Sequence, residues 1–345
     1  MAGAGASVAV AIVSYNTREL LDRCLRSLEP DVRAGRATAW VVDNGSKDGS
    51  VALVRECHPW TQLIEPGENL GFGAAVNLVA QQTFTPWIAP SNADVELEPG
   101  ALEALLDAGG RLGGAGALAP RLLLGGGETQ HSVYPFPTLP FLALFNLGMG
   151  WLSAGWADER CLEGRWNPER AREVDWAIGA FLLVRREAWD QAGGFDEAQW
   201  MYAEDLDLGW RLRRAGWSTF YQPAARIRHH ASAATAAAWG DGRTERWQRA
   251  TYAWMLRRRG MARTRAAALI NVAGAAGRAA GLTPAARARP ARFAPARASA
   301  ARWTRLHART GLAPRARLES QDVQRKVIHG SSLTSTSGPK SGASR

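Results

Sequence analysis

The feature that most constrains the fold is a regular alternation, through the first third of the chain, of apolar runs of strand length with segments whose apolar residues recur at helical spacing. The run VAVAIVSY precedes RELLDRCLRSLEP, and the run TAWVVDN precedes SKDGSVALVREC. TQLIEP and GFGAAVNLVAQQT repeat the pattern, and PWIAPSNAD supplies a fourth strand. Strands that alternate with helices of this length are typical of a parallel sheet covered by helices. The sequence therefore predicts an α/β layer fold.

Polar residues follow the predicted strands directly, where ligands bind in sheets of this kind. Residues two apart on an extended chain face the same side, so Asn92 and Asp94 are placed to approach one cation. Mg²⁺ and Mn²⁺ prefer oxygen ligands and keep waters and substrate phosphates, so one or two protein ligands suffice. A turn-forming role is the alternative for Asp43 and Asp94. The candidate residues after the strands are Ser14, Tyr15, Asn16, Asp43, Asn92 and Asp94.

The charge divides the chain near residue 245. Residues 1–245 hold 21 Lys and Arg against 30 Asp and Glu, and residues 246–345 hold 21 against 2, so the net charge of +10 divides into −9 and +19. We expect a basic helical extension over residues 246–290, then an Ala/Arg/Pro linker and a disordered tail over residues 291–345. Arginines near aromatic residues are typical of a helix on an anionic membrane surface. Nucleic-acid binding and a solvated tail without a partner are the alternatives.

The alternation also stops between residues 125 and 173, where the apolar stretch VYPFPTLPFLALFNLGMGWLSAGW appears. Pro135, Pro137 and Pro140 interrupt its first half, and the remainder is too short to cross a bilayer. We expect a re-entrant, interfacial or substrate-covering segment, and an ordinary buried insertion is the alternative.

Cysteine usage and the first residues bear on the compartment. Cys24, Cys57 and Cys161 are too few and too scattered for a disulfide framework. The N-terminal stretch has no basic n-region, and its apolar run has only strand length. We therefore expect a cytoplasmic protein.

The stretch WMYAEDLDLGWRLRRAGW, residues 200–217, places three carboxylates within four positions on a predicted helix. Asp207 precedes Arg211 by four residues, the spacing of an ion pair on a helix surface, so we assign it a structural role. A charged amphipathic helix without chemistry is the alternative for the whole stretch. The other two carboxylates are Glu204 and Asp205.

Eight blocks, in order along residues 7–235, resemble the family-2 inverting glycosyltransferases and their rhamnosyltransferase-like branch. They are VAIVSYN, VVDNGSKDGS, ENLGFGAAVN, SNADV, GAFLLVRR, GGFDE, MYAEDLDLGWRLRRAGW and a following His. The resemblance implies a GT-A fold, a nucleotide-sugar donor, a divalent cation (Mg²⁺ or Mn²⁺) and single-displacement transfer with inversion. The metal signature of this branch is Asn-Pro-Asp, and Ala93 stands here in the place of the proline without removing a ligand. The C-terminal third lies outside the resemblance.

The resemblance also implies roles for individual residues. Asp205 matches the catalytic base, and the first turn of a helix suits that role because the helix N-terminus stabilises a carboxylate that is ready to accept a proton. Asp94 and His229 match the metal site, with His229 preferred to its neighbour His230. The remaining matches are nucleotide contacts at Ser14, Tyr15, Asn16, Asp43, Asn69, Asn77 and Asn92, and substrate contacts at Glu204, Trp176 and Gly179.

Some of these residues have structural alternatives. Asn69 and Asn77 are also suited to helix capping, and His229 to a buried hydrogen bond. Trp176 is equally suited to a plain core position, and Glu204 either binds acceptor hydroxyls or orients Asp205.

We therefore expect residues 1–245 to form a catalytic domain that transfers a sugar to a hydroxyl of a cell-surface polysaccharide or lipid-linked glycan. The branch favours L-rhamnose from a dTDP- or UDP-linked donor, at the inner face of the plasma membrane and without a nucleic-acid partner. A sugar nucleotidyltransferase needs a Gly-rich basic loop after the first strand, and SYNTREL has none. An inactive transferase-like domain that binds membrane or nucleic acid is the other alternative, and the intact Asp43, Asp94 and Asp205 argue against it.

Overall fold

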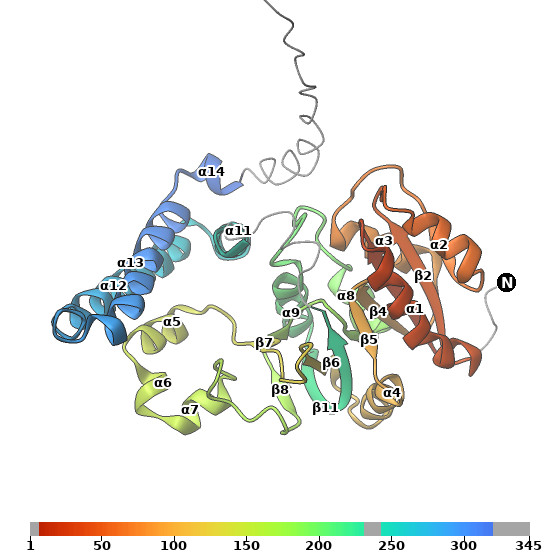
Figure 1. The fold of residues 1–345 in the computed structure, drawn as a ribbon, viewed down its shortest axis with the longest axis horizontal. Helices are drawn as coiled ribbons and strands as arrows, with labels where there is room; N and C mark the ends of the chain where they lie inside the picture. Colours follow the sequence, from red (N-terminus) through yellow and green to blue (C-terminus); the bar gives the residue numbers. More distant parts are fainter. Residues whose placement is uncertain (1–6, 231–242, 320–345) are drawn as a thin grey trace, which may run out of the picture.

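The computed structural model describes residues 7–230 and 243–319, and a twisted nine-stranded sheet lies at its centre (Figure 1). The strand order is β3-β2-β1-β4-β10-β6-β11-β5, and β8 pairs with β11 beside this path. The predicted α/β layer fold is confirmed. The strands are β1 (Val8–Ser14), β2 (Ala37–Asp43), β3 (Gln62–Ile64), β4 (Trp87–Asn92), β5 (Val95–Leu97), β6 (Ala115–Leu123), β8 (Arg172–Val174), β10 (Leu183–Arg185) and β11 (Ser218–His229).

Strand β1 shows why the sheet is covered on both faces. Val8, Val10 and Ile12 pack into one apolar core, while Ala11 packs into a second core on the opposite face. Helices α1 (Arg18–Arg33) and α4 (Ala101–Arg111) complete the first core, and α3 (Phe72–Gln82), α8 (Arg186–Ala192) and α9 (Glu204–Arg214) complete the second. A continuous apolar run is therefore required along this strand. Helix α2 (Ser50–Cys57) packs beside α1.

The parallel register brings the polar strand ends to one edge. Strand β1 pairs with β2 and with β4, and the register sets Ser14 opposite Asp43 and Val13 opposite Asn92. The chain runs from β1 outward to β2 and β3 and then returns to β4 on the other side of β1, so this edge is the switch point at which α/β sheets bind ligands.

The apolar insertion forms three short helices, α5 (Leu139–Asn146), α6 (Met149–Leu152) and α7 (Ala154–Glu159). Strands β7 (Val133–Tyr134) and β9 (Trp176–Ala177) pair with each other and flank it in the sequence. Leu147, which follows α5, and Trp151 and Leu152 of α6 are 77%, 82% and 78% exposed, so the alternative of an ordinary buried insertion does not describe this part. Throughout the described ranges, every helix is too short or too polar to cross a bilayer.

The basic C-terminal part packs against the rest of the chain, as four helices: α11 (Arg243–Arg259), α12 (Met261–Ala288), α13 (Pro290–Gly311) and α14 (Arg315–Glu319). Figure 1 shows α11, α12 and α13 beside α5, on the side of the sheet away from α1 and α2. Tyr252, Trp254 and Met255 of α11 are buried in a core that also contains Leu206 of α9. The division predicted at residue 245 therefore does not separate two cores.

The prediction of a linker from residue 291 is wrong, because residues 290–311 form α13. Ala and Arg have high helix propensity, and a proline at the first helical position lacks only a hydrogen bond that the helix could not make there. Pro290 occupies that position. The tail predicted to be disordered lies outside the described residues, which end at residue 319.

Candidate active site

Asp43 ends β2 at the switch-point edge. Its Oδ1 accepts hydrogen bonds from the N–H groups of Gly45 (3.1 Å) and Ser46 (2.7 Å). Its Oδ2 is buried and has no hydrogen-bond partner within the part of the chain that the structure describes. One oxygen thus forms the turn that was the structural alternative, and the other is an acceptor held ready for a ligand.

The loop after β1 is locked to the loop after β2. Asn16 adopts a left-handed backbone conformation (φ 52°), which Asn tolerates better than most residues. Its N–H donates to Ser46 Oγ, and its Oδ1 accepts from the N–H of Lys47, each at 2.8 Å. Ser14 is fully buried, and Tyr15 beside it is half-buried. These predicted contacts therefore lie in one rigid double loop at the edge that contains Asp43.

Asn69 and Asn77 lie in different surroundings. Asn69 Oδ1 accepts from the N–H of Gly71 (2.9 Å), and the carbonyl of Gly71 accepts from Nδ2 of Asn44, which follows Asp43. Asn69 is therefore joined to the loop at the strand edge. Asn77 bonds both backbone groups of Phe195, with Nδ2 donating to its O and Oδ1 accepting from its N–H, each at 3.0 Å. Asn77, on α3, therefore fixes the loop that contains Phe195 to this helix.

Asp94 and His229 meet because β11 runs antiparallel to β5. The register sets His229 opposite Val95, and Asp94 Oδ1 lies 3.3 Å from His229 Nε2. His229 Nδ1 donates to Gln130 Oε1 at 2.7 Å, and Nε2 on the other side of the ring faces the carboxylate. His230 lies on the other side of the strand, where its Nε2 donates to Glu96 Oε1 (2.6 Å).

These two side chains fit a divalent cation. Asp94 Oδ1 and His229 Nε2 are both buried, and neither makes a hydrogen bond in the described part of the molecule. Burial by itself raises the pKa of Asp94, but the neighbouring His229 outweighs it and holds the pKa below 3.8. A carboxylate oxygen and a neutral imidazole suit Mn²⁺, and Gln130 orients the ring as an outer partner. Among residues 7–230 and 243–319, no cluster of three or more His, Cys, Asp or Glu is arranged to hold a metal ion.

A short backbone path joins this edge to Asp205. The N–H of Asn92, at the end of β4, donates to the carbonyl of Ala180 (2.9 Å). The N–H of the preceding Gly179 donates to Asp205 Oδ2 (3.1 Å). Asp94 and Asp205, 111 positions apart in the sequence, therefore lie at the same edge of the sheet.

The start of α9 is strained where it positions Asp205. Tyr202 and Ala203 have φ angles of 64° and 63°, a left-handed conformation that costs about 1–3 kcal/mol for each residue with a side chain. The Leu206 N–H donates to Asp205 Oδ1 (2.8 Å), so both carboxylate oxygens accept a backbone hydrogen bond. Burial raises the pKa of Asp205 from 3.8 to about 6, against the lowering effect of the hydrogen bonds from Leu206 and Gly179. Asp205 is half-buried, and its carboxylate has the basicity that a general base at neutral pH requires.

Glu204 and Asp207 differ although they are three residues apart. Burial, and next the charge of Asp205, raises the pKa of Glu204 well above 4.5, and its Oε2 has no hydrogen-bond partner among the described residues. The predicted ion pair of Asp207 with Arg211 is confirmed at 2.7 Å, but Asp207 is fully buried and the Arg211 side chain is only 15% exposed, so the pair does not lie on the helix surface. Helix α11 covers it, because Arg258 Nε (2.6 Å) and Trp254 Nε1 (2.9 Å) also donate to Asp207.

Comparison with known proteins decides the family. The models described as Glycosyl transferase family 2 and Glycosyltransferase like family 2 match residues 9–139 and 163–250. An N-acetylglucosaminyl-diphospho-decaprenol L-rhamnosyltransferase of Mycobacterium tuberculosis is 37% identical over 238 residues, which cover 66% of this chain and 76% of that protein. The chain belongs to glycosyltransferase family 2. The resemblance seen in its sequence blocks is thereby confirmed, and the protein is a glycosyltransferase.

Solved structures agree on the fold of this glycosyltransferase. A mannosyltransferase from Pyrobaculum calidifontis, in complex with GDP-Man and Mn²⁺, has a TM-score of 0.52 and 18% identity, over 93% of this chain and 87% of that chain. GalNAc-T7 with UDP, GalNAc and Mn²⁺ has a TM-score of 0.50 and 12% identity, over 71% of this chain and 50% of that chain. At these identities the likeness concerns the fold alone, and it confirms the predicted GT-A fold.

Two predicted substrate residues of the glycosyltransferase lie next to helix α9. Trp176 is buried, its ring stacks on Tyr134 (centroids 4.9 Å apart), and its Nε1 donates to the carbonyl of Pro135 (3.2 Å). Trp176 nevertheless lines a large cavity next to α9. Gly179 contributes its N–H to Asp205, and a Cβ at this position would lie 3.2 Å from Phe72, so a side chain would crowd the site.

Three residues of the site were not foreseen. Gln130 orients His229 from 99 positions away, and Trp254 and Arg258 bind Asp207 from 47 and 51 positions away. Arg258 lies in the run of arginines that was predicted to lie on a membrane surface. No local spacing signals such partners, because the pairing depends on how α11 packs against α9.

Proposed function

We propose that this chain transfers L-rhamnose from a dTDP-linked donor to a hydroxyl of N-acetylglucosamine carried on a lipid diphosphate, with inversion at the transferred sugar. The relative from Mycobacterium tuberculosis supports this substrate pair, because its 37% identity spans 238 residues. The observation that carries the proposal is the position of Asp205, whose half-buried carboxylate has a pKa of about 6 and lies at the edge where β1, β2 and β4 end.

The nucleotide and the cation belong to the strand-edge side of the site. Asp43 Oδ2 accepts a hydrogen bond from the base, and Asp94 Oδ1 with His229 Nε2 hold Mg²⁺ or Mn²⁺. Within residues 7–230 and 243–319 these two side chains would supply the protein ligands, and water and the diphosphate would supply the others. When bound, the ion neutralises the charge that develops on the departing diphosphate.

Asp205 acts on the acceptor side. The acceptor hydroxyl attacks the anomeric carbon opposite the diphosphate, and its proton passes to the Asp205 carboxylate as the new bond forms. Backbone N–H groups hold both carboxylate oxygens, which fixes the direction from which Asp205 meets the hydroxyl. Glu204 is buried and keeps its proton more strongly than a free glutamate, so we assign it to orienting Asp205.

We propose the cytoplasmic face of the membrane as the place of action. Helices α12 and α13 carry exposed arginines, among them Arg287, Arg297 and Arg305, which suit anionic lipid headgroups. The exposed apolar side chains of α6, next to these helices, suit the region just below the headgroups.

A transfer assay tests the proposal. The chain is incubated with dTDP-L-rhamnose, UDP-GlcNAc or GDP-mannose and a synthetic lipid-diphosphate-linked GlcNAc, with Mn²⁺ or with EDTA, and products are followed by mass spectrometry and NMR. We expect transfer from dTDP-L-rhamnose and from neither of the other donors. The product should have the inverted anomeric configuration, and EDTA should abolish transfer. Transfer of another sugar, or retention, contradicts the proposed reaction. If no donor gives transfer or donor hydrolysis, the result favours the alternative, an inactive transferase-like binding protein.

A further inference from the structure

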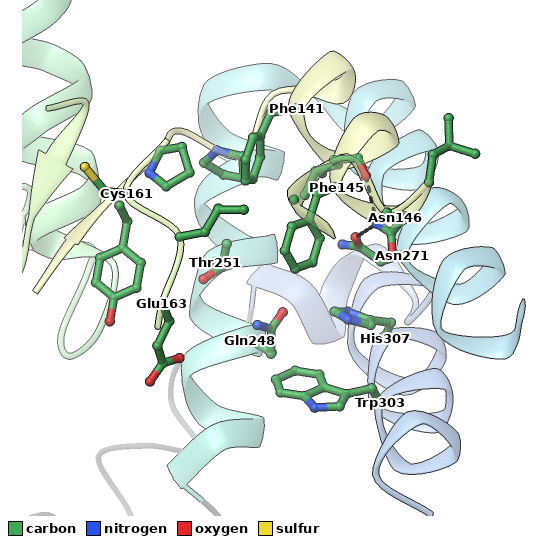
Figure 2. Close-up of a pocket in the computed structure, with 18 of the residues that line it drawn as sticks. Phe141, Phe145, Asn146, Cys161, Glu163, Gln248, Thr251, Asn271, Trp303 and His307 are labelled. Carbon is green, nitrogen blue, oxygen red and sulfur yellow. Dashed lines mark hydrogen bonds between the residues drawn. The ribbon is translucent and has the colours of Figure 1, made fainter. Parts of the chain in front are cut away.

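A cavity of about 1180 Å³ lies between the insertion helices and the C-terminal helices. Figure 2 shows Phe141 and Phe145 of α5 on one side, Thr251 of α11 in the middle, and Trp303 and His307 of α13 on the other. The volume exceeds the range of about 300–1,000 Å³ that is usual for small-molecule sites. The cavity is therefore suited to a large ligand.

The inner end of the cavity reaches the catalytic residues. Its lining includes Leu206, which directly follows Asp205, and Trp176, which stacks on Tyr134. Burial, and then the charges of Glu163 and Asp205, raises the pKa of Tyr134, so the carboxylate of Asp205 is within electrostatic reach of this wall. A ligand in the cavity lies beside the place where an acceptor hydroxyl meets Asp205.

The outer end opens through apolar side chains. Phe145, Leu147 and Trp151 line the cavity and are also 43%, 77% and 82% exposed. Leu152, which follows Trp151, is 78% exposed. A mouth for a sugar or a nucleotide would carry polar partners, whereas this mouth joins the cavity to an apolar surface.

A chain of hydrogen bonds holds the walls in place. Arg278 donates to Asn146 Oδ1 (3.1 Å), and Asn146 Nδ2 donates to Asn271 Oδ1 (2.9 Å). Asn271 Nδ2 donates to the hydroxyl of Tyr252 (3.1 Å), which in turn pairs with His307 Nδ1 (3.0 Å). The chain links α5, α12, α11 and α13, and Figure 2 shows its Asn146–Asn271 step. The cavity is thus preformed, with its polar groups paired among themselves.

We propose that this cavity binds the isoprenoid chain of a lipid-diphosphate-linked acceptor, an inference that rests on the proposed function. The sugar at the head of such an acceptor lies at the Asp205 end, and its chain runs past Leu206 and Thr251 and leaves at Trp151 toward the bilayer. The charged side chains that line the cavity are Arg165 and Arg278 against Glu163, and this excess of positive charge suits an anionic diphosphate.

Gly281 offers a variant that fills the cavity without disturbing the fold. It lines the cavity on α12, and a Cβ there would have no atom within 4 Å. Gly277, one turn earlier on the same helix, is equally open, and it lies outside the cavity lining. Gly281→Phe therefore narrows the cavity, and Gly277→Phe is its matched control.

A binding experiment with the full chain tests the proposal. Calorimetry and tryptophan fluorescence measure the binding of a C15 prenyl diphosphate and of inorganic diphosphate. We expect the prenyl compound to bind about 100-fold more tightly than diphosphate. Gly281→Phe should weaken its binding about 10-fold and leave diphosphate binding unchanged, while Gly277→Phe should match the parent chain. Equal binding of the two compounds, or full prenyl binding by Gly281→Phe with a parent-like melting temperature, overturns the proposal.

The transfer assay separates this proposal from the proposed function. Prenyl binding in the cavity without rhamnosyl transfer would refute the function and leave the cavity assignment standing. Rhamnosyl transfer that is equally efficient to C15-linked and short water-soluble acceptors would refute the cavity assignment alone. Light scattering detects whether the chain self-associates. A dimer formed through this face, together with a monomer fraction that does not bind the prenyl compound, would also refute the cavity assignment.

Discussion

The two sides of the active site are built in different ways. On the strand-edge side, Asp43 and Asn16 are fixed by hydrogen bonds within two adjacent loops, and Asp94 meets His229 through strand register. On the helical side, α5, α11, α12 and α13 enclose an apolar cavity with side chains that lie far apart in the sequence. Asp205 lies between the two sides, held through Gly179 to the first and followed by Leu206 in the wall of the second.

This difference indicates how the work is divided. A charged nucleotide donor needs polar atoms at fixed positions, and short loops at strand ends supply them with little freedom to vary. An apolar chain needs volume and apolar surface, which many combinations of side chains provide. We therefore propose that the strand-edge side binds the donor and that the helical side selects what the acceptor is attached to.

The largest effect is expected where the two sides meet. Asp205→Asn preserves shape but removes the proton acceptor, so kcat should fall about 10³-fold while the Kd for the dTDP donor stays unchanged. Transfer kinetics and calorimetric titration of donor measure the two quantities. Asp107→Asn, at an exposed carboxylate of α4, is the control and should behave as the parent chain. Parent-like turnover by Asp205→Asn would refute the division of labour at its centre.

The pH dependence sharpens the same point. Since burial raises the pKa of Asp205 to about 6, kcat/KM should fall as the pH drops through that value and the base takes up a proton. Stability follows the opposite course, because the folded state disfavours the ionised carboxylate. The contribution of Asp205 to stability is highest below its ordinary pKa of 3.8 and is lost as the pH rises toward 6. Asp205→Asn should therefore melt at a higher temperature than the parent at about pH 7.5, and the difference should vanish near about pH 4.

On the strand-edge side, changes at Asp94 and Gln130 should lower the affinity for Mn²⁺. Asp94→Asn should weaken Mn²⁺ binding about 100-fold and Gln130→Leu about 10-fold, because the second change frees only the orientation of His229. Titration of Mn²⁺ in the presence of dTDP measures both. Glu96→Gln, which touches the neighbouring His230, is the matched control. An unchanged affinity in Asp94→Asn would remove the cation from this position.

The helical side should respond first in stability. Arg258→Met leaves Asp207 buried with Arg211 and Trp254 only, and it should lower the free energy of unfolding by about 2 kcal/mol. The exposed Arg263 of α12 provides the control, since Arg263→Met should change the free energy of unfolding by less than about 0.5 kcal/mol. Urea unfolding gives both values. Equal effects of the two variants would show that α11 is not fastened to α9 through Asp207.

The smallest effect is expected at the mouth of the cavity. Trp151→Ser should weaken binding to anionic lipid vesicles about 10-fold, because one large apolar side chain no longer enters the interface. Phe84→Ser is the control, since Phe84 is 92% exposed and lies between α3 and β4, away from this surface. Vesicle sedimentation measures both. The comparison between the sides weakens if the two variants bind vesicles alike.

The strand-edge side could be predicted largely from the sequence. The apolar runs give the strands, the polar residues after them give the edge, and alternation along β11 separates His229 from His230. These features depend on neighbours in the sequence or on one strand pairing, which periodicity reports. Asn77 is the exception, because its bonds to Phe195 depend on a contact between α3 and a distant loop.

The helical side could be predicted only in outline. The prolines of this segment predict a linker, but α13 forms there, because their effect on local structure is opposed by the high helix propensity of Ala and Arg. The left-handed start of α9 at Tyr202 and Ala203 has no sequence signal, because both residues carry side chains. The sequence predicts a membrane surface for Arg258, but its side chain binds Asp207. This pairing has no local sequence signal, because it depends on how α11 packs over α9.

The most direct test of the central claim is a crystal structure with dTDP and Mn²⁺, in which anomalous scattering locates the ion. We expect one Mn²⁺ peak at Asp94 Oδ1 and His229 Nε2, the base at Asp43, and a metal-free Asp205 facing the cavity side. A peak at Glu204 and Asp205, or a nucleotide lying in the cavity between α5 and α13, would contradict it.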